Sequence, residues 1–299
     1  MLKTGLAILN AYIQTPASLH FYKRMKEELG SLGVALDYKT NSEILSYITS
    51  SGDLLAKEME KYDFVLYLDK DLYVSEMLAK AGVRLFDNAE AIRLCDDKML
   101  TYITLSNNGI KMPKTISAPL NYAGIDDETF IKQVAKELSF PLVAKDNFGS
   151  LGKEVYLIKN YDELVVFEKQ HKFNAHLYQE FIESSKGHDY RIILIGGKVV
   201  ASMKRCNDNG DFRSNVAQGG HGELIDLPES FKETAEKAAK ILNLDYCGVD
   251  LLDDKDGSPV LCEVNSNAFL QEIEKITGKN IAGLYAKHIV DSIKLRLKK

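Results

Sequence analysis

The stretch GVDLLDDKDGSPVLCEVN, residues 248–265, determines the architecture expected for the C-terminal part of the chain. Two apolar-rich runs flank the segment DDKDG at 253–257, whose residue types favour a tight turn. A turn centred on this segment places Asp250 about opposite Cys262 or Glu263. The stretch therefore predicts an antiparallel hairpin that carries acidic residues.

Three oxygen-bearing side chains can converge on this hairpin. Glu263 and Asn265 are two residues apart, so they share one face of their strand. With a one-residue bulge or slip in the turn, Asp250 can join them. Oxygen ligands without cysteine or histidine suit Mg²⁺, which keeps some waters and takes further ligands from phosphates. The spacing alone fits a solvated face of an amphipathic hairpin equally well.

A second hairpin is predicted by RIILIGGKVVASMKR, residues 191–205, with its turn at Gly196–Gly197. The turn brings Arg191 and Arg205 close together, and Arg213 follows in a loop rich in small polar residues. Several arginines near one hairpin suit carboxylate or phosphate recognition. Scattered surface arginines would explain the same pattern.

An apolar strand that ends at Lys145 leads into a glycine-containing loop within PLVAKDNFGSLGKEV, residues 141–155. Backbone N–H groups of Gly149, Ser150 and Gly152 can face a phosphate, and the lysine can add a point charge. The loop is not a Walker A motif, because G-x-x-x-x-G-K-[ST] is absent. A loop of this kind, taken alone, is more often a plain hairpin turn.

The first 95 residues alternate strands with helices, which predicts a parallel sheet with helices on its faces. The elements expected there are strands at 5–9, 34–38, 64–68 and 83–86, and helices at 18–32, between 38 and 64, and at 72–80. A single helix is expected over 89–108. Further on we expect helices at 126–138, 230–242 and 281–297, strands at 142–145, 155–158 and 176–180, and paired strands from residue 189 onward.

The bulk properties exclude several classes of protein. The chain has 299 residues, a net charge of −5 and a pI of about 5.8, and a general nucleic-acid binder would usually be basic. Its four cysteines show no C-x-x-C spacing, so neither a zinc site nor a disulfide framework is expected. Free thiols suit a reducing cytosol. We expect neither a signal peptide nor a membrane span, because no run of 18 apolar residues occurs.

Taken in order, these segments resemble the ATP-grasp fold and, within it, the RimK-type amino-acid ligases. The matching segments are DDKMLTYITLSNNGIKMPKT, AKDNFGSLGKEV, YQEFIESSKGHDYRIILIGGKVVASMKR, GDFRSNVAQGG, GVDLLDD and EVNSNAFLQEIEKITGKNIA. They cover roughly residues 88–290, and the first unit resembles the family's Rossmann-like, parallel-sheet N-terminal domain. The resemblance implies a mixed α/β and α+β fold with an N-terminal domain at 1–95, a linker-helix and lid subdomain at 96–185, and a C-terminal subdomain with the metal site at 186–299.

The resemblance also implies a role for each matching residue around the nucleotide. The phosphates would be held by Lys98 and Lys145 under a mobile lid at Gly149, Ser150 and Gly152, the adenine would lie at Glu180 and Phe181, the ribose at Asp189, and the nucleotide and substrate site would be lined by Arg213, Ser214 and Asn215.

For metal and catalysis, the resemblance implies that Asp250, Glu263 and Asn265 bind two Mg²⁺ ions, for which Mn²⁺ can substitute. Arg205 would stabilise the acyl phosphate and the tetrahedral intermediate, with Arg191 as a second anion contact. One departure concerns the loop after the metal strand. Many relatives read E-x-N-x-x-P-G, whereas this chain reads EVNSNAFLQ, which puts the amine-side substrate in question.

The implied function is that of an ATP-dependent carboxylate–amine ligase acting through an acyl phosphate. It would add an amino acid such as glutamate to a peptide or small-molecule carboxylate. Two alternatives stay open: a ligase of two small molecules, as in glutathione or dipeptide synthesis, and a non-catalytic ATP-binding regulator. We expect a cytoplasmic homo-oligomer without nucleic-acid or membrane partners.

Overall fold

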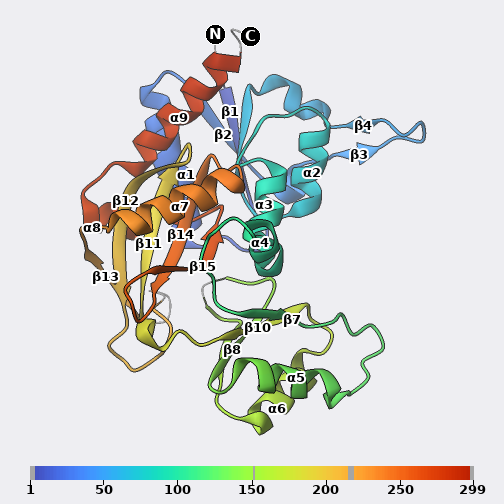
Figure 1. The fold of residues 1–299 in the computed structure, drawn as a ribbon. Coiled ribbons are helices and arrows are strands. Elements are labelled where there is room, and N and C mark those ends of the chain that lie inside the picture. The colour runs from blue at the N-terminus through green and yellow to red at the C-terminus, as the bar shows by residue number, and fades with distance from the viewer. Residues whose placement is uncertain (1–3, 151, 215–218, 297–299) are drawn as a thin grey trace.

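The computed structural model describes residues 4–150, 152–214 and 219–296, and Figure 1 shows their arrangement. The strands are β1 (Thr4–Leu9), β2 (Ala35–Thr40), β3 (Tyr47–Ile48), β4 (Leu54–Leu55), β5 (Phe64–Leu68), β6 (Leu85–Phe86), β7 (Thr115–Ser117), β8 (Leu142–Asp146), β9 (Val155–Ile158), β10 (His176–Glu180), β11 (His188–Ile195), β12 (Lys198–Cys206), β13 (His221–Leu224), β14 (Tyr246–Asp253) and β15 (Pro259–Asn265). The α-helices are α1 (Pro16–Ser31), α2 (Leu72–Lys80), α3 (Ala89–Asp96), α4 (Lys98–Leu105), α5 (Glu128–Leu138), α6 (Tyr161–His171), α7 (Glu229–Ile241), α8 (Gln271–Thr277) and α9 (Ile281–Arg296). Short 3₁₀ helices are η1 (Asn41–Glu43), η2 (Lys57–Lys61) and η3 (Glu183–Ser185).

The N-terminal sheet is parallel, as the sequence predicts, with the strand order β2-β1-β5-β6. Its central strand β1 is buried on both faces. Leu6 and Ile8 belong to one apolar core, whereas Ala7 and Leu9 belong to another that also contains residues of α1 and α9. This two-sided burial explains the unbroken apolar run at the start of the chain.

The prediction of a helix between residues 38 and 64 is wrong. The chain forms η1, the hairpin β3–β4 and η2 there, and the hairpin projects from the molecule in Figure 1. The turn closes when the Thr49 amide donates to the Asp53 carbonyl at 2.8 Å, and Gly52 supplies a φ of +88°. The apolar side chains Leu45 and Ile48 are exposed, so no buried helix face forms.

The single helix expected over 89–108 is also wrong, because the chain breaks at Asp97 into α3 and α4. Asp97 is extended, with φ −90° and ψ 107°, and its carboxylate accepts hydrogen bonds from the amides of Met99 and Leu100. An aspartate that caps a helix in this way starts a new one. Lys98 is therefore the first residue of α4.

The second sheet has the order β7-β10-β8-β9 and is antiparallel throughout. Helices α5 and α6 lie on its side away from the rest of the molecule in Figure 1, and both contribute to one apolar core with the sheet. We call this unit the lid sheet.

The third sheet has the order β13-β12-β11-β14-β15 and is also antiparallel. Its predicted Gly196–Gly197 turn is confirmed, with φ of +57° and +74° at the two glycines. Ile192 and Leu194 pack toward the core that includes α7, whereas Ile193 and Ile195 pack toward the core that includes α8 and α9. Neither β13 nor α8 was expected from the sequence.

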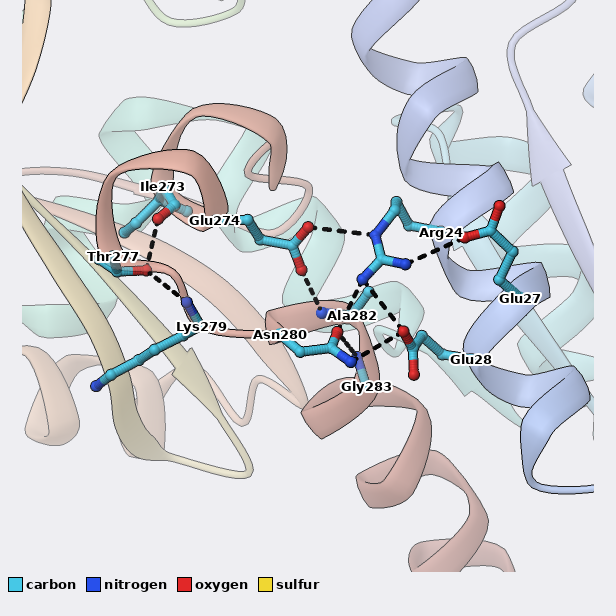
Figure 2. A network of polar contacts seen from close by, with 10 residues as sticks. All are labelled: Arg24, Glu27, Glu28, Ile273, Glu274, Thr277, Lys279, Asn280, Ala282 and Gly283. Carbon is cyan, nitrogen blue, oxygen red and sulfur yellow. Dashed lines mark hydrogen bonds and ion pairs between the residues drawn. The ribbon is translucent and has the colours of Figure 1, made fainter.

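A polar network joins the N-terminal unit to the C-terminal helices (Figure 2). Arg24 of α1 donates from Nε to Glu274 of α8 at 3.3 Å and from Nη2 to Asn280 at 2.9 Å. Glu274 also accepts from the amide of Ala282 at 2.9 Å, and Asn280 donates to Glu28 at 2.9 Å. The network fixes α8 and the start of α9 against α1. Among the described residues, no helix is long and apolar enough to cross a membrane.

We predict opposite effects of alanine at two glycines of the N-terminal unit. A Cβ on Gly5 in β1 would lie 2.7 Å from Cε1 of the buried Phe64, so Gly5→Ala should destabilise the protein by about 1–3 kcal/mol. Gly30 in α1 is exposed and has no atom near its Cβ position, so Gly30→Ala should stabilise by about 0.4–1 kcal/mol. Urea unfolding measures both values. Equal effects would contradict the packing of β1 on β5.

Candidate active site

A cleft runs between the lid sheet and the third sheet, and most residues singled out in the sequence line it. Those residues are Lys98, Lys145, Gly149, Ser150, Gly152, Glu180, Phe181, Asp189, Arg205, Arg213, Ser214, Asp250 and Glu263. Three others do not belong to this lining as described: Arg191 and Asn265 are outside it, and Asn215 lies outside the described residues.

The β14–β15 hairpin brings its acidic residues together through a bulge. Asp250 pairs with Glu263, but Leu251 pairs with Leu261, so Cys262 is the extra residue. The Tyr102 hydroxyl of α4 donates to the Cys262 carbonyl oxygen at 2.5 Å, which fixes α4 against the hairpin. The bulge that the metal hypothesis required is therefore present, and Asp250 lies opposite Glu263.

Four buried or half-buried charges form a chain across strands β12, β11 and β14. Arg191 donates from Nε and Nη2 to the two carboxylate oxygens of Asp250, the second at 2.7 Å. Arg205 contacts the same Asp250 from Nη2 at 3.0 Å. It also donates from Nε to Asp189 at 2.7 Å and from Nη2 to the other oxygen of Asp189. The two arginines and two aspartates are neutral as a group. The Nη1 atoms of Arg191 and Arg205 make no hydrogen bond with any described residue.

The pKa values of Asp250 and Arg205 follow from burial and from the charged groups beside them. Burial alone would raise the pKa of Asp250, but Arg191 and Arg205 outweigh it and hold that pKa below its usual value. Burial would likewise lower the pKa of Arg205, but Asp189 and Asp250 raise it above the ordinary value. Both groups therefore stay charged at neutral pH.

Two buried lysines face the cleft from different elements. Lys98, at the start of α4, donates from Nζ to the Gly149 carbonyl oxygen at 3.1 Å, and burial lowers its pKa. The ammonium of Lys145, at the end of β8, makes no hydrogen bond or ion pair with any described residue. Burial disfavours its ammonium form, but nearby groups that include Glu263 and Asp250 raise its pKa overall. A buried ammonium without a partner is suited to binding an anion.

The glycine-containing loop closes over the cleft. Gly149 and Gly152 have φ of +132° and +71°, conformations that favour glycine. Arg213 donates from Nη1 to the Gly152 carbonyl oxygen at 2.7 Å, and its other nitrogens are held by Asp211. Arg213 therefore connects the loop after β8 to the loop after β12.

Part of the cleft wall is apolar, and sequence reasoning missed most of it. This part includes Val143, Val155, Ile182, Leu252 and Phe212. Glu180 accepts from the Lys114 amide at 2.8 Å, and the Phe181 ring meets Phe212 edge-on with centroids 6.2 Å apart. Val143 and Leu252 stand two residues from Lys145 and Asp250 in their strands. The period of two could therefore have revealed them as neighbours of predicted polar residues.

The three residues expected to bind metal are only partly gathered. Within the described residues, no three His, Cys, Asp or Glu side chains converge as a metal site. The side chains of Glu263 and Asn265 make no hydrogen bond to other described residues, whereas the carboxylate oxygens of Asp250 accept from arginines. Each carboxylate oxygen has two lone pairs, so Asp250 retains acceptor capacity. The donor set of two carboxylates and an amide fits a hard divalent cation that takes its remaining ligands from phosphate and water.

The family model for the RimK-like ATP-grasp domain matches residues 95–293. The chain is 35% identical over 230 residues to a protein of Danio rerio named beta-citrylglutamate synthase B, covering 77% of this chain and 56% of that protein. The chain thus spans about half the length of that relative. It is also 35% identical to a probable alpha-L-glutamate ligase of Psychromonas ingrahamii, with 93% of both proteins covered.

Solved structures agree on the fold. A D-alanine–D-alanine ligase of Bacillus anthracis superposes with a TM-score of 0.75 at 20% sequence identity, covering 100% of this chain and 99% of that one. The family model matches about two thirds of the sequence. The matched residues include those that line the cleft and the β14–β15 hairpin with its acidic side chains. The chain belongs to the family of RimK-like ATP-grasp proteins.

Proposed function

We propose that this protein is an ADP-forming carboxylate–amine ligase that joins an amino acid such as glutamate to a peptide or small-molecule carboxylate. The observation that carries the proposal is the buried Lys145 ammonium, which has no hydrogen bond or ion pair with a described residue. It lies in the same cleft as Lys98, Glu263 and an apolar pocket. Such a cleft suits a nucleotide, with the base against the apolar wall and the phosphates at the lysines.

The chemistry follows from the poor reactivity of a carboxylate. Its oxygen attacks the γ-phosphorus of ATP, the bond to the β–γ bridging oxygen breaks, and ADP leaves. The amine nitrogen then attacks the acyl carbon, the bond to the phosphate oxygen breaks, and inorganic phosphate leaves. Lys98 and Lys145 would neutralise the transferred phosphoryl group, and Nη1 of Arg205 would face the acyl phosphate oxygen.

Magnesium would be held by Glu263, Asn265 and the remaining acceptor capacity of Asp250, and Mn²⁺ could substitute. When bound, it supplies positive charge that aligns the phosphates. Two ions would be held if both oxygens of the Glu263 carboxylate served as ligands. The loop at Gly149–Gly152 would exclude water from the acyl phosphate, which hydrolyses readily, and Arg213 would hold that loop closed.

The relatives' names direct the search for substrates. Glutamate is the amine to test first, and citrate and N-acetylaspartate are acids to test, because another relative is a human protein named N-acetylaspartylglutamate synthase A. A screen for phosphate release with these acids and L-glutamate, followed by mass spectrometry of the products, tests the function. We also propose a reducing, cytoplasmic location, which the four free cysteines support. A homo-oligomer is a further proposal, and a measurement of the molecular mass in solution would test it.

The reaction should yield ADP and inorganic phosphate in equal amounts, because the cleft is arranged around transfer of the terminal phosphoryl group. Chromatography of the nucleotides after turnover with L-glutamate and the acid measures this. Stoichiometric AMP and pyrophosphate would mean an acyl adenylate and would overturn the mechanism.

Lys145→Ala should weaken ATP binding by roughly 10- to 150-fold, because charge-assisted contacts of this kind contribute about 1.5–3 kcal/mol. Calorimetric titration with a non-hydrolysable ATP analogue and Mg²⁺ measures the affinity. Lys132→Ala on the outer helix α5 is the control and should bind like the wild type. Unchanged affinity and turnover in Lys145→Ala would remove this lysine from the site.

Glu263→Gln should abolish Mg²⁺-dependent ADP production while leaving the free energy of unfolding within about 0.5 kcal/mol of the wild type. The Glu263 carboxylate has no hydrogen-bond partner among the described residues, so little folding energy depends on its charge. Asp250→Asn should instead lower the melting temperature, because it removes the charge that Arg191 and Arg205 share. Near wild-type turnover of Glu263→Gln at ordinary Mg²⁺ concentration would show that the metal binds elsewhere.

A further inference from the structure

Glu272, the second residue of α8, carries a carboxylate that the mechanism above does not use. It is half-buried and makes no hydrogen bond or ion pair with any described residue. Its neighbour Glu274 is fully engaged with Arg24 and the amide of Ala282 (Figure 2). A carboxylate that is partly buried and unpaired beside a reaction site is suited to binding a cation.

The position of Glu272 follows from a glycine in β13. Gly222 pairs directly with Arg205 across β12 and β13, so a side chain at Gly222 would lie on the same face of the sheet as Arg205. A Cβ at Gly222 would stand 3.2 Å from Oε1 of Glu272. The atom nearest to that Cβ would be Cδ1 of Ile276, so Ile276 fills the space at Gly222, and the Glu272 carboxylate lies beside it on the face of the sheet that carries Arg205.

The two arginines that act on Glu272 are already paired with other carboxylates, and Lys275 is a further cation near it. Arg205 and Arg191 already balance Asp189 and Asp250. Burial raises the pKa of Glu272, the two arginines and Lys275 act in the opposite direction, and Asp189 raises it further. A carboxylate with a raised pKa accepts a proton from an ammonium more readily than an ordinary one.

We propose that Glu272 binds the ammonium group of the incoming amino acid and takes its proton, so that the amine can attack the acyl phosphate. The first proton moves from the ammonium nitrogen to a Glu272 oxygen. The nitrogen lone pair then forms the C–N bond, the C–O bond to phosphate breaks, and the second amine proton leaves with the phosphate. The role is that of a catalytic base and amine-binding residue. The inference rests on the proposed ligase function and assigns the side of Arg205 at which the amine enters.

The test compares two nucleophiles in the wild type, Glu272→Gln and Glu272→Ala. L-Glutamate carries an ammonium that must lose a proton, whereas hydroxylamine is uncharged at neutral pH and attacks an acyl phosphate without a base. With citrate or N-acetylaspartate as the acid, amide formation with L-glutamate should fall roughly 10²-fold or more in both variants. Hydroxamate formation should stay near the wild-type rate, and the ATP affinity should be unchanged.

Two further readouts separate a base from a structural residue. Raising the pH deprotonates the amine in solution, so amide formation by Glu272→Gln should recover more steeply than that of the wild type. The binding of L-glutamate to the protein loaded with Mg²⁺ and a non-hydrolysable ATP analogue should weaken. Gln271→Ala, at the neighbouring exposed position, is the matched control and should behave as the wild type. Melting temperatures verify that each variant is folded.

The outcomes distinguish the two levels of the argument. If the wild type forms neither amide nor hydroxamate with either acid, the proposed function fails, and the role of Glu272 falls with it. If the wild type forms both products and the variants lose both equally, or lose neither, the ligase function stands and the assignment of Glu272 is overturned. Selective loss of the amide reaction with rescue at high pH supports it.

Discussion

The chain of ion pairs from Arg191 through Asp250 and Arg205 to Asp189 fixes the geometry on which the cleft depends. The four residues come from three neighbouring strands, and the adjacent residues Ile192 and Val249 are buried in apolar surroundings on the opposite face. A one-residue slip of any of these strands would exchange the two faces. Loss of one charged partner would leave an uncompensated buried charge, which costs about 3–5 kcal/mol. The register of the sheet is thereby fixed, and Asp250 is held opposite Glu263.

Because these four ion-paired residues are neutral as a group, the attraction for phosphate comes mainly from other groups. Lys98 and Lys145 reach the cleft from α4 and β8, which are outside the third sheet. The Tyr102 hydroxyl and the Lys98 ammonium tie α4 to the β15 bulge and to the loop after β8. These hydrogen bonds position the two lysines relative to the acidic hairpin, and neither of them involves the Lys145 ammonium. A neutral scaffold beside unpaired cations and the Glu263 carboxylate suits an anionic substrate accompanied by a metal ion.

The sequence predicted those parts of the fold that depend on local signals. Alternation of strands and helices predicted the parallel sheet, and paired glycines predicted the β11–β12 turn. The prediction failed where a local pattern competed with tertiary burial or capping, as at residues 39–63 and at Asp97. For the site, polar residues near turns and strand ends were found, because they stand out against apolar strands. The pairing of Asp189 with Arg205 was not predicted, because the turn alone would place Asp189 opposite Lys204, and a bulge between Ile193 and Leu194 shifts its partner to Arg205.

The loop after β15 lacks the Pro-Gly pattern expected from the resemblance, and its contacts explain how it is ordered without those residues. The Tyr246 hydroxyl donates to the Ala268 carbonyl oxygen at 2.6 Å, and Asn267 donates to the Asp69 carbonyl oxygen at 3.0 Å. These bonds attach the loop to both the third sheet and the N-terminal unit, and they set the direction in which α8 begins. Residues two apart on a helix point to nearly opposite sides. Fixing α8 through Glu274 therefore turns Glu272 toward the sheet, where its Oε1 lies near Gly222, the residue paired with Arg205.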